Sequence, residues 1–342
     1  MYRLLALLLC AVAMSACPAK SETDGKLAAQ SHATATASAN PTVVLLLSGS
    51  TQSQWDSELL ASIGAQLGFA PYEKQETRGH LDLLGPYEVK LGDTAVRLAI
   101  CMLGLDSLSG LQAQTDVGLE AREWLDAQQP KVAWLDGDRA QFFVGRTLVA
   151  TTPVVFSGVV SDRQSYYTQN ATGVYERPAL PALLKLIWER APKAKNFALL
   201  SDAAPVSRGS VAKFHELLTF ALQGDGKALA LEPAQDWAML HERLLQAQKE
   251  ADAVIIAGIG EEQGGEAFQP PCPEGLLKGV TIPVIAVGSN DAATCFPVTV
   301  RLRASAHARL ALGMCGQVLD GVDPGGIPTV TPEEMQVTVN EK

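Results

Sequence analysis

The chain has 342 residues, of which 47% are hydrophobic and only 19% are charged, so it is long and apolar enough to bury two cores. Its 37 acidic and 27 basic side chains give a formal net charge of -10, which excludes a broad electrostatic footprint on nucleic acid or anionic lipid. Beyond residue 20, no apolar run approaches the roughly 18 to 20 residues that span a bilayer. Any membrane attachment therefore has to come from the N-terminus.

The first residues have the pattern of an export signal. Arg3 supplies a positive start, and the apolar stretch that follows has the length of a secretory signal core but is too short to span a membrane. This stretch ends in Met-Ser-Ala-Cys, which resembles the lipobox at which bacterial lipoprotein precursors are lipidated and cleaved. We expect residues 1–16 to be a signal peptide and Cys17 to be the lipidated first residue of the mature chain. Ordinary signal-peptidase cleavage near Ala16 or Ala19 is the alternative.

Residues 17–40 are expected to form a flexible tether behind the lipidated cysteine. From residue 18 this segment consists largely of Ala, Ser, Thr, Lys and Gln and has no aromatic side chain. Such a composition buries too little apolar surface to offset the entropy lost on ordering. A tether of this kind would hold a folded body near a membrane without fixing its orientation. The alternative is that these residues are an irregular N-terminal segment of the mature chain with no anchoring role.

The cysteines of the folded body predict one disulfide in an exported protein. Four cysteines lie beyond the signal and the lipidation site: Cys101, Cys272, Cys295 and Cys315. Cys272 and Cys295 flank a predicted strand and lie in loop sequence, so they are the favoured pair. Cys101 lies in an apolar strand and Cys315 in a helix, where buried free thiols are expected. No cysteine or histidine spacing fits zinc, so we expect no metal site and no cofactor.

From residue 41 onwards, short apolar runs rich in β-branched residues alternate with amphipathic helical stretches. This alternation is typical of α/β proteins whose parallel strands are joined by helices. In the first half we expect strands at 42–47, 96–103, 132–135 and 154–156, and helices at 55–67, 111–127 and 139–149. The less regular residues 69–94 are expected to add a hairpin or a long loop.

The same alternation restarts after Gly158. Strands are expected at 173–175, 197–200, 228–231, 253–257, 282–287, 297–301 and 335–340, and helices at 179–190, 211–222, 237–248 and 304–319. The pattern predicts two doubly wound parallel-sheet lobes with a cleft and three chain crossings. We expect lobe 1 to be 41–157, completed by about 292–321, and lobe 2 to be 158–291, completed by about 322–342.

Three stretches carry a family resemblance. They are Thr152-Pro-Val-Val-Phe-Ser-Gly-Val159 with the preceding Leu135-Asp-Gly-Asp-Arg-Ala140, then Ala171-Thr-Gly-Val-Tyr-Glu176 with its following helix and strand, and finally Ile327-Pro-Thr-Val330 with Met335-Gln-Val-Thr-Val-Asn340. They are similar to the type I periplasmic substrate-binding proteins of ABC transporters, in a family that includes tryptophan and tyrosine binders. The resemblance implies a two-lobed, Venus-flytrap fold, a small-molecule ligand and an ABC permease as partner. At the end of the second strand, members of this family often have an aspartate followed by a basic residue. In this chain Asp106 is followed by Ser107 and Leu108 instead.

In open α/β sheets, ligands bind beyond the carboxyl ends of the strands, where loops and helix N-termini converge. The candidate ligand-binding residues are the polar residues and glycines of these loops: Ser48, Ser50, Thr51, Asp136, Asp138, Ser157, Gly158, Ser201, Asp202, Ser207, Arg208, Gly258 and Asn290.

Each group of candidates has a structural alternative. The hydroxyls of Ser48, Ser50 and Thr51 suit a ligand carboxylate at a helix N-terminus, or they cap that helix. Asp136 and Asp138 can accept hydrogen bonds from a ligand ammonium, or either can cap the next helix. Ser157 and Gly158 lie at a crossing, where hinge and ligand roles coincide. Arg208 can clamp a carboxylate or remain a solvated surface arginine, and Gly258 fits a tight turn at the cleft edge.

No catalytic motif competes with a binding role. The chain has no G-x-S-x-G elbow, no Walker motif and no H-E-x-x-H sequence, so we expect no enzymatic activity. We expect an exported, membrane-anchored lipoprotein that captures a small, carboxylate-bearing, amino-acid-like molecule and delivers it to an ABC importer. A ligand-sensing lipoprotein that feeds a signalling partner is the rival binding role. A periplasmic hydrolase that uses cleft carboxylates is the enzymatic rival.

The anchor predicts a simple separation of membrane attachment from ligand binding. Cys17→Ser should abolish membrane association and leave ligand binding intact, because the tether separates the lipid from the folded body. Membrane fractionation and calorimetry on the same preparations measure the two properties. Unchanged membrane retention of the variant would contradict lipidation at Cys17.

Overall fold

The computed structural model describes residues 40–73, 75–148, 151–167, 169–177, 180–259, 268, 272–288 and 295–340. The expected signal peptide, Cys17, most of the expected tether and the candidate residue Asn290 lie outside the described residues.

The first half of the chain builds a seven-stranded sheet in the order β2-β3-β4-β1-β5-β6-β7. Its strands are β1 (Thr42–Leu47), β2 (Gln75–Arg78), β3 (Leu81–Leu91), β4 (Thr94–Met102), β5 (Val132–Asp136), β6 (Val154–Val159) and β7 (Ala171–Tyr175). Strands β4, β1, β5, β6 and β7 pair in parallel. Strands β2 and β3 form an antiparallel hairpin that joins β4, which is the hairpin expected within residues 69–94.

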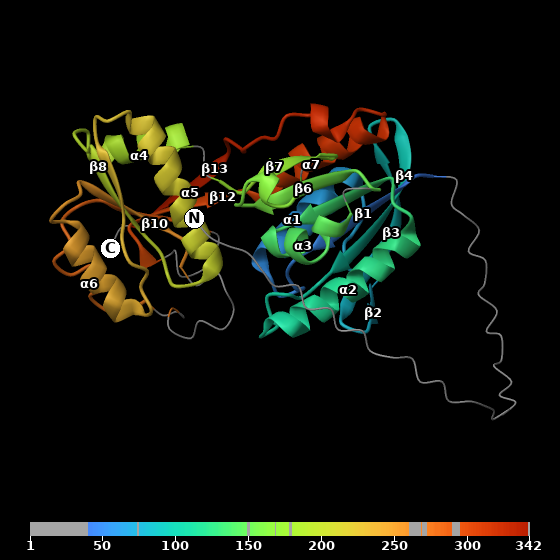
Figure 1. Ribbon diagram of the computed structural model, residues 1–342, viewed down its shortest axis with the longest axis horizontal. Coiled ribbons are helices and arrows are strands. Elements are labelled where there is room, and N and C mark those ends of the chain that lie inside the picture. The colour runs from blue at the N-terminus through green and yellow to red at the C-terminus, as the bar shows by residue number, and fades with distance from the viewer. Residues whose placement is uncertain are drawn as a thin grey trace, which may run out of the picture. The chain divides into compact units, whose positions relative to one another are not determined.

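Helices cover both faces of this first sheet, as Figure 1 shows. They are α1 (Gln54–Leu67), α2 (Leu111–Gln128), α3 (Asp138–Phe143) and α7 (Ala304–Leu319), with the short 3-10 turns Gly145–Thr147, Arg163–Ser165 and Pro324–Gly326 near the same sheet. The alternation of side chains along β1 explains the two layers. Val43, Leu45 and Leu47 pack with α1 and α7, whereas Val44 and Leu46 pack with α2 and α3. A strand buried on both faces reads as a continuous apolar run, which is how the sequence of β1 appears.

The second sheet has six strands in the order β13-β12-β11-β10-β8-β9. They are β8 (Asn196–Leu200), β9 (Lys227–Ala230), β10 (Ala253–Ala257), β11 (Val284–Val287), β12 (Val298–Leu302) and β13 (Met335–Val339). All pairs are parallel except the last, in which β13 runs antiparallel to β12. Helices α4 (Leu180–Arg190) and α5 (Pro205–Leu222) pack with Phe197 and Leu199, and α6 (Trp237–Ala247) packs with Ala198 and Leu200. The expected α/β fold class with two doubly wound sheets is therefore confirmed.

The structure corrects two expected lobe assignments. Residues 173–175 were expected in the second lobe, but β7 pairs with β6 in the first sheet, because Ala171 and Val174 are buried in the first-sheet core. The strand after residue 297 was expected to return to the first lobe, but β12 pairs with β11, because Val298 and Val300 are buried in the second-sheet core. Helix α7 does return to the first sheet, and β13 lies in the second.

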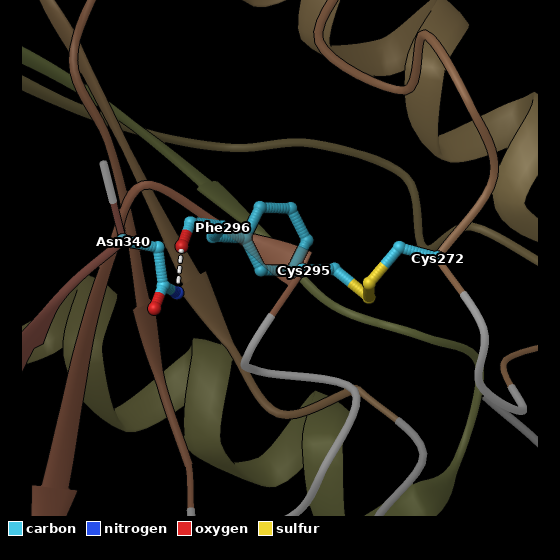
Figure 2. The surroundings of a disulfide bond; sticks show 4 residues. All are labelled: Cys272, Cys295, Phe296 and Asn340. Carbon is cyan, nitrogen blue, oxygen red and sulfur yellow. Dashed lines mark hydrogen bonds between the residues drawn. A yellow bond between two sulfur atoms is a disulfide. The ribbon is translucent and has the colours of Figure 1, made fainter. Parts of the chain in front are cut away.

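A disulfide joins Cys272 and Cys295, whose Cα atoms are 5.4 Å apart, and this is the pair favoured from the sequence. Figure 2 shows Cys295 beside Phe296, whose carbonyl oxygen accepts a hydrogen bond of 2.7 Å from the Asn340 side chain. The bridge thus closes a loop around β11, and Phe296, which follows Cys295 in the chain, contacts the residue that follows β13. Among the described cysteines, Cys101 and Cys315 are free and buried.

This bridge should stabilise the second lobe by restricting the unfolded chain. Because the two cysteines are 23 residues apart, replacing both by alanine should lower the free energy of unfolding by about 3 kcal/mol. Urea unfolding measures that change, and peptide mapping without reductant should recover a Cys272–Cys295 peptide. Free thiols at both positions in protein purified without reductant would contradict the pairing.

Candidate functional site

A buried polar network lies at the carboxyl ends of β1, β5 and β6. Its centre is Asp136, the last residue of β5, whose surface is only 1% exposed. Trp55 on α1 donates its indole N–H to Asp136 Oδ2 at 2.9 Å, and the Ser157 hydroxyl donates to Oδ1. The indole of Trp134 in turn donates to Ser157 Oγ at 2.7 Å. Asp136 and Ser157 therefore hold the ends of neighbouring strands together, and both carboxylate oxygens already accept a hydrogen bond.

Burial changes the acid–base behaviour of two carboxyl groups here. Burial raises the pKa of Asp136 to about 6, although the hydrogen bonds from Ser157 and Trp55 oppose that rise. Burial, and then the charge of Asp136, raise the pKa of Asp56 well above its usual range. Asp56 lies in the first turn of α1 and is also buried. The two carboxyls therefore titrate as an interacting pair, and at least one of them holds a proton more tightly than an exposed aspartate does.

Gly158 and His307 close the network from the side of α7. Gly158 has a φ of 61°, and a Cβ at this position would lie 2.9 Å from Asp136 Oδ1, so only glycine fits. Its backbone N–H donates to Nδ1 of the fully buried His307 at 3.4 Å. Burial lowers the pKa of His307 to about 3, so the imidazole is neutral. The Trp55 ring packs edge-on against it, with ring centroids 5.0 Å apart. The sequence reasoning missed His307, because a lone histidine in an alanine-rich helix gives no signal.

The three candidates after β1 have structural roles. Helix α1 begins at Gln54, and its N-cap is Ser53, whose hydroxyl accepts from the Asp56 N–H at 3.3 Å. The expectation that Ser50 and Thr51 stand at this helix N-terminus is therefore wrong by a few residues, because Ser53 has the capping geometry. Ser48 binds another helix, since its hydroxyl accepts from the Ala140 N–H of α3 at 3.0 Å. The Ser50 hydroxyl accepts from the Gln52 N–H at 3.3 Å, and the carbonyl of the half-buried Thr51 accepts from the Ser57 hydroxyl at 3.3 Å.

Asp138 holds the loop that follows β6. It is the first residue of α3. Its carboxylate accepts from the N–H groups of Val160 at 2.8 Å and Ser161 at 3.2 Å and from the Tyr166 hydroxyl at 2.7 Å. The Asp138 side chain therefore fixes the conformation of a surface loop. These contacts join α3 to the loop after β6, so capping of α3 is not its main role.

The second-sheet candidates gather around the start of α5. Asp202 accepts from the Ala204 N–H at 3.0 Å, and the Ser201 hydroxyl donates to the Asp202 carbonyl at 2.8 Å. Helix α5 begins earlier than expected, so Ser207 and Arg208 both lie in its first turns. Ser207 is fully buried, and no described residue provides a hydrogen-bond partner for its hydroxyl; Arg208 is exposed. The buried Gly258 has a φ of 91° and donates its N–H to the Val287 carbonyl at 3.3 Å, which fits the expected tight turn.

A cavity of about 560 Å³ lies beside the carboxyl ends of β4 and β6. Its walls come from the loop between β4 and α2, from α2 and α3, from the loop after β6 and from Gly209 on α5: Asp106, Leu108, Ser109, Gly110, Leu111, Gln114, Asp138, Arg139, Phe142, Phe143, Val160, Ser161, Tyr166 and Gly209. The volume is in the range that small-molecule sites use. Of the sequence-predicted candidates that lie among the described residues, only Asp138 lines this cavity. The other walls were missed because they come together only when α2 and α3 pack on the sheet.

Three ion pairs lie near these loops, and two of them join elements of the two sheets. Asp162, in the loop after β6, binds Lys213 of α5 and Arg177, each at 3.0 Å. Although partial burial acts in the opposite direction, the hydrogen bond from Lys213 and the charge of Arg177 hold the pKa of Asp162 below its usual value. Glu58 of α1 binds Arg301 of β12 at 2.8 Å. These contacts tie α1 and the β6 loop of the first lobe to α5 and β12 of the second.

Within the described ranges, no group of three or more His, Cys, Asp or Glu side chains is arranged to hold a metal ion. No helix in the part of the chain that the structure describes is long and apolar enough to cross a membrane.

Comparison with solved structures shows that the chain has the fold of the type I periplasmic substrate-binding proteins. An ABC domain in complex with L-Trp from Streptococcus pneumoniae matches with a TM-score of 0.55 at 14% identity, over 88% of this chain and 92% of that chain. A ligand-free, open substrate-binding protein with adhesive properties from Clostridium difficile matches with a TM-score of 0.57 at 12% identity, over 88% and 92% of the two chains. An arabinose-binding protein from Geobacillus stearothermophilus matches with a TM-score of 0.51 at 9% identity, over 88% and 97%. No family model and no curated protein matches the sequence.

The buried Asp136 predicts an unusual pH dependence of stability. Because its pKa is about 6 in the folded chain against 3.8 ordinarily, the native state binds more protons than the unfolded state between about pH 4 and 6. The contribution of Asp136 to the free energy of unfolding is therefore fully present below about pH 4, where the carboxyl is protonated. It is lost as the pH rises through about 6. Between pH 4 and 7 the free energy of unfolding of the wild type should fall by about 2 kcal/mol relative to Asp136→Asn.

Urea unfolding at several pH values measures this difference. Trp55→Phe provides a matched comparison, because it removes a hydrogen bond that lowers the pKa of Asp136 and should move the window to higher pH. Identical pH dependence in the wild type and in Asp136→Asn would contradict the assignment.

Proposed function

We propose that this chain is an exported solute-binding lipoprotein that captures a small molecule and delivers it to an ABC importer. The lipid at Cys17 would hold it at a membrane on the periplasmic or external side, and the permease subunits would be its protein partner. No chemistry is performed on the ligand in this proposal. The fold supports it, because the solved structures that share this fold include proteins described as binding L-Trp and arabinose.

The observation that carries the proposal is the position of the cavity. It opens beside the carboxyl ends of β4 and β6, which is where open α/β sheets bind ligands. Gly209 of α5 contributes to a wall that otherwise comes from the first lobe, so residues of both lobes meet at this cavity. The ion pair between Asp162 and Lys213 joins the same loop to the same helix. A solute bound here would contact both lobes, as a receptor that closes on its ligand requires.

We infer further that the ligand carries a carboxylate and resembles an amino acid. The first turns of α5 support this class, because no side chain caps the helix and its free N–H groups favour a negative charge. The Ser207 hydroxyl has no partner among the described residues, and the exposed Arg208 follows it. A carboxylate at this point would accept hydrogen bonds from both side chains.

The function is tested by identifying what the protein carries. Protein purified from its own cells is denatured, and the released small molecules are identified by mass spectrometry and then titrated back by calorimetry. The proposal expects one solute that binds unchanged and stabilises the fold. Absence of any binding solute would contradict a receptor role, and chemical conversion of the solute would indicate a hydrolase instead.

The carboxylate site predicts a specific loss of affinity. Combined replacement of Ser207 and Arg208 by alanine should weaken binding of a carboxylate solute by roughly 2 to 4 kcal/mol, the sum of a neutral and a charge-assisted hydrogen bond. Arg190→Ala is the matched control, because Arg190 is exposed in the last turn of α4, away from the cavity lining. A carboxylate solute that binds the double variant as tightly as the wild type would show that the site lies elsewhere.

A further inference from the structure

The cavity beside β4 and β6 combines apolar walls with a few charged groups. Leu108, Phe143 and Val160 contribute apolar side chains, and Phe142 and Leu111 do so while remaining 44% and 67% exposed. Large apolar side chains that stay exposed at the edge of a cavity are suited to an apolar ligand surface. The body of a solute bound here is therefore expected to be largely apolar.

The charged groups that the described residues contribute to the lining are two carboxylates and one guanidinium, and two of the three already bind protein groups. The Asp138 carboxylate accepts hydrogen bonds from two backbone N–H groups and from the Tyr166 hydroxyl. Arg139 donates its Nη1 to the Leu105 carbonyl at 2.9 Å, next to Asp106 in the chain. Asp138 and Arg139 are thus occupied in holding the walls in place.

Asp106 differs from both of these groups. Its Oδ1 atom is buried and has no hydrogen-bond partner, and no ion pair within the described part of the chain includes its carboxylate. The amide of Gln114 is not available to it, since Nε2 donates to the carbonyls of Leu105 and Leu108. A buried carboxylate oxygen without a donor is costly, so a donor from a ligand that reaches Asp106 Oδ1 would bring a real gain.

The surrounding charges favour a cationic donor. Two carboxylates against one guanidinium give the described part of the lining a net negative charge. The buried Asp56 lies close enough for the charge of Asp106 to contribute to the raised pKa of Asp56. A cation beside Asp106 would reduce this repulsion, whereas an anion would add to it.

We propose that Asp106 is the recognition group of this cavity and selects solutes that carry a cationic amine on an apolar body. This inference rests on the proposed function and adds to it the residue that would bind the amine and select for it. The carboxylate of an amino-acid-like ligand would bind at the start of α5, and the amine would bind at Asp106. The two subsites come from different lobes.

Three probes with the same aromatic body separate the head groups: phenethylamine, 2-phenylethanol and 3-phenylpropionate. Calorimetry on the full-length protein, freed of bound solute, should show that the amine binds at least about tenfold more tightly than the alcohol or the acid. Asp106→Asn should bring the affinity for the amine to within about threefold of that for the alcohol, because only the charge is removed.

Asp116→Asn is the matched control, because it removes one carboxylate from the nearby α2 without touching the cavity lining. It should keep the preference for the amine. Thermal unfolding checks that each variant is folded. If Asp106→Asn does not fold, Asp106→Ala replaces it in the comparison of amine and alcohol affinities. Equal binding of the three probes, binding of none of them, or a preference that survives removal of the Asp106 carboxylate would overturn the inference.

The released solute distinguishes this failure from failure of the proposed function. A natural solute that binds tightly but has no amine overturns the role of Asp106 and leaves the receptor role intact. A solute that carries an amine and loses affinity in Asp106→Asn supports both. If no solute is recovered and none of the three probes binds, both proposals fail.

Discussion

The burial of the Asp136 carboxylate is the constraint on which the carboxyl edge of the first sheet depends. A buried carboxylate has to be supplied with donors, and here the indole of Trp55 and the hydroxyl of Ser157 supply them. Those two donors fix α1 and β6 to the end of β5. The same carboxylate leaves no room for a side chain at Gly158, whose N–H reaches His307 on α7. One carboxyl group therefore positions two strand ends and two helices.

The polar groups near this edge differ in whether the protein itself supplies their hydrogen bonds. Ser48, Asp136, Asp138 and Ser157 all have their hydrogen bonds satisfied within the protein. Among the described residues, Asp106 beside the cavity and Ser207 in the first turns of α5 each have a buried oxygen without a hydrogen-bond partner, and Nε2 of His307 in the network itself is also unpaired. A network that holds loops in place and leaves selected groups unsatisfied is a suitable frame for a binding site.

The fold was predictable from the sequence because both sheets are built from apolar runs with helical stretches between them. Thr42–Leu47 and Ala253–Ala257 are examples whose burial on both faces leaves an unmistakable pattern. The lobe boundary was not predictable, since β7 has the same local character as a strand of either sheet and only pairing with β6 places it. The loop candidates shared this difficulty. Their polar character predicts that they lie beyond the carboxyl ends of the strands, but which groups remain unpaired depends on contacts such as Trp55 with Asp136, which join residues 81 positions apart.

The central claim is that a small molecule binds at the loops after β4, β5 and β6 and at the start of α5. Amide hydrogen exchange, compared between the solute-free protein and the same protein with its released solute restored, tests this claim most directly. The account predicts added protection in residues 104–114, 138–143, 160–166 and 202–209. Protection confined to other elements, such as β9 or the β2–β3 hairpin, would contradict it.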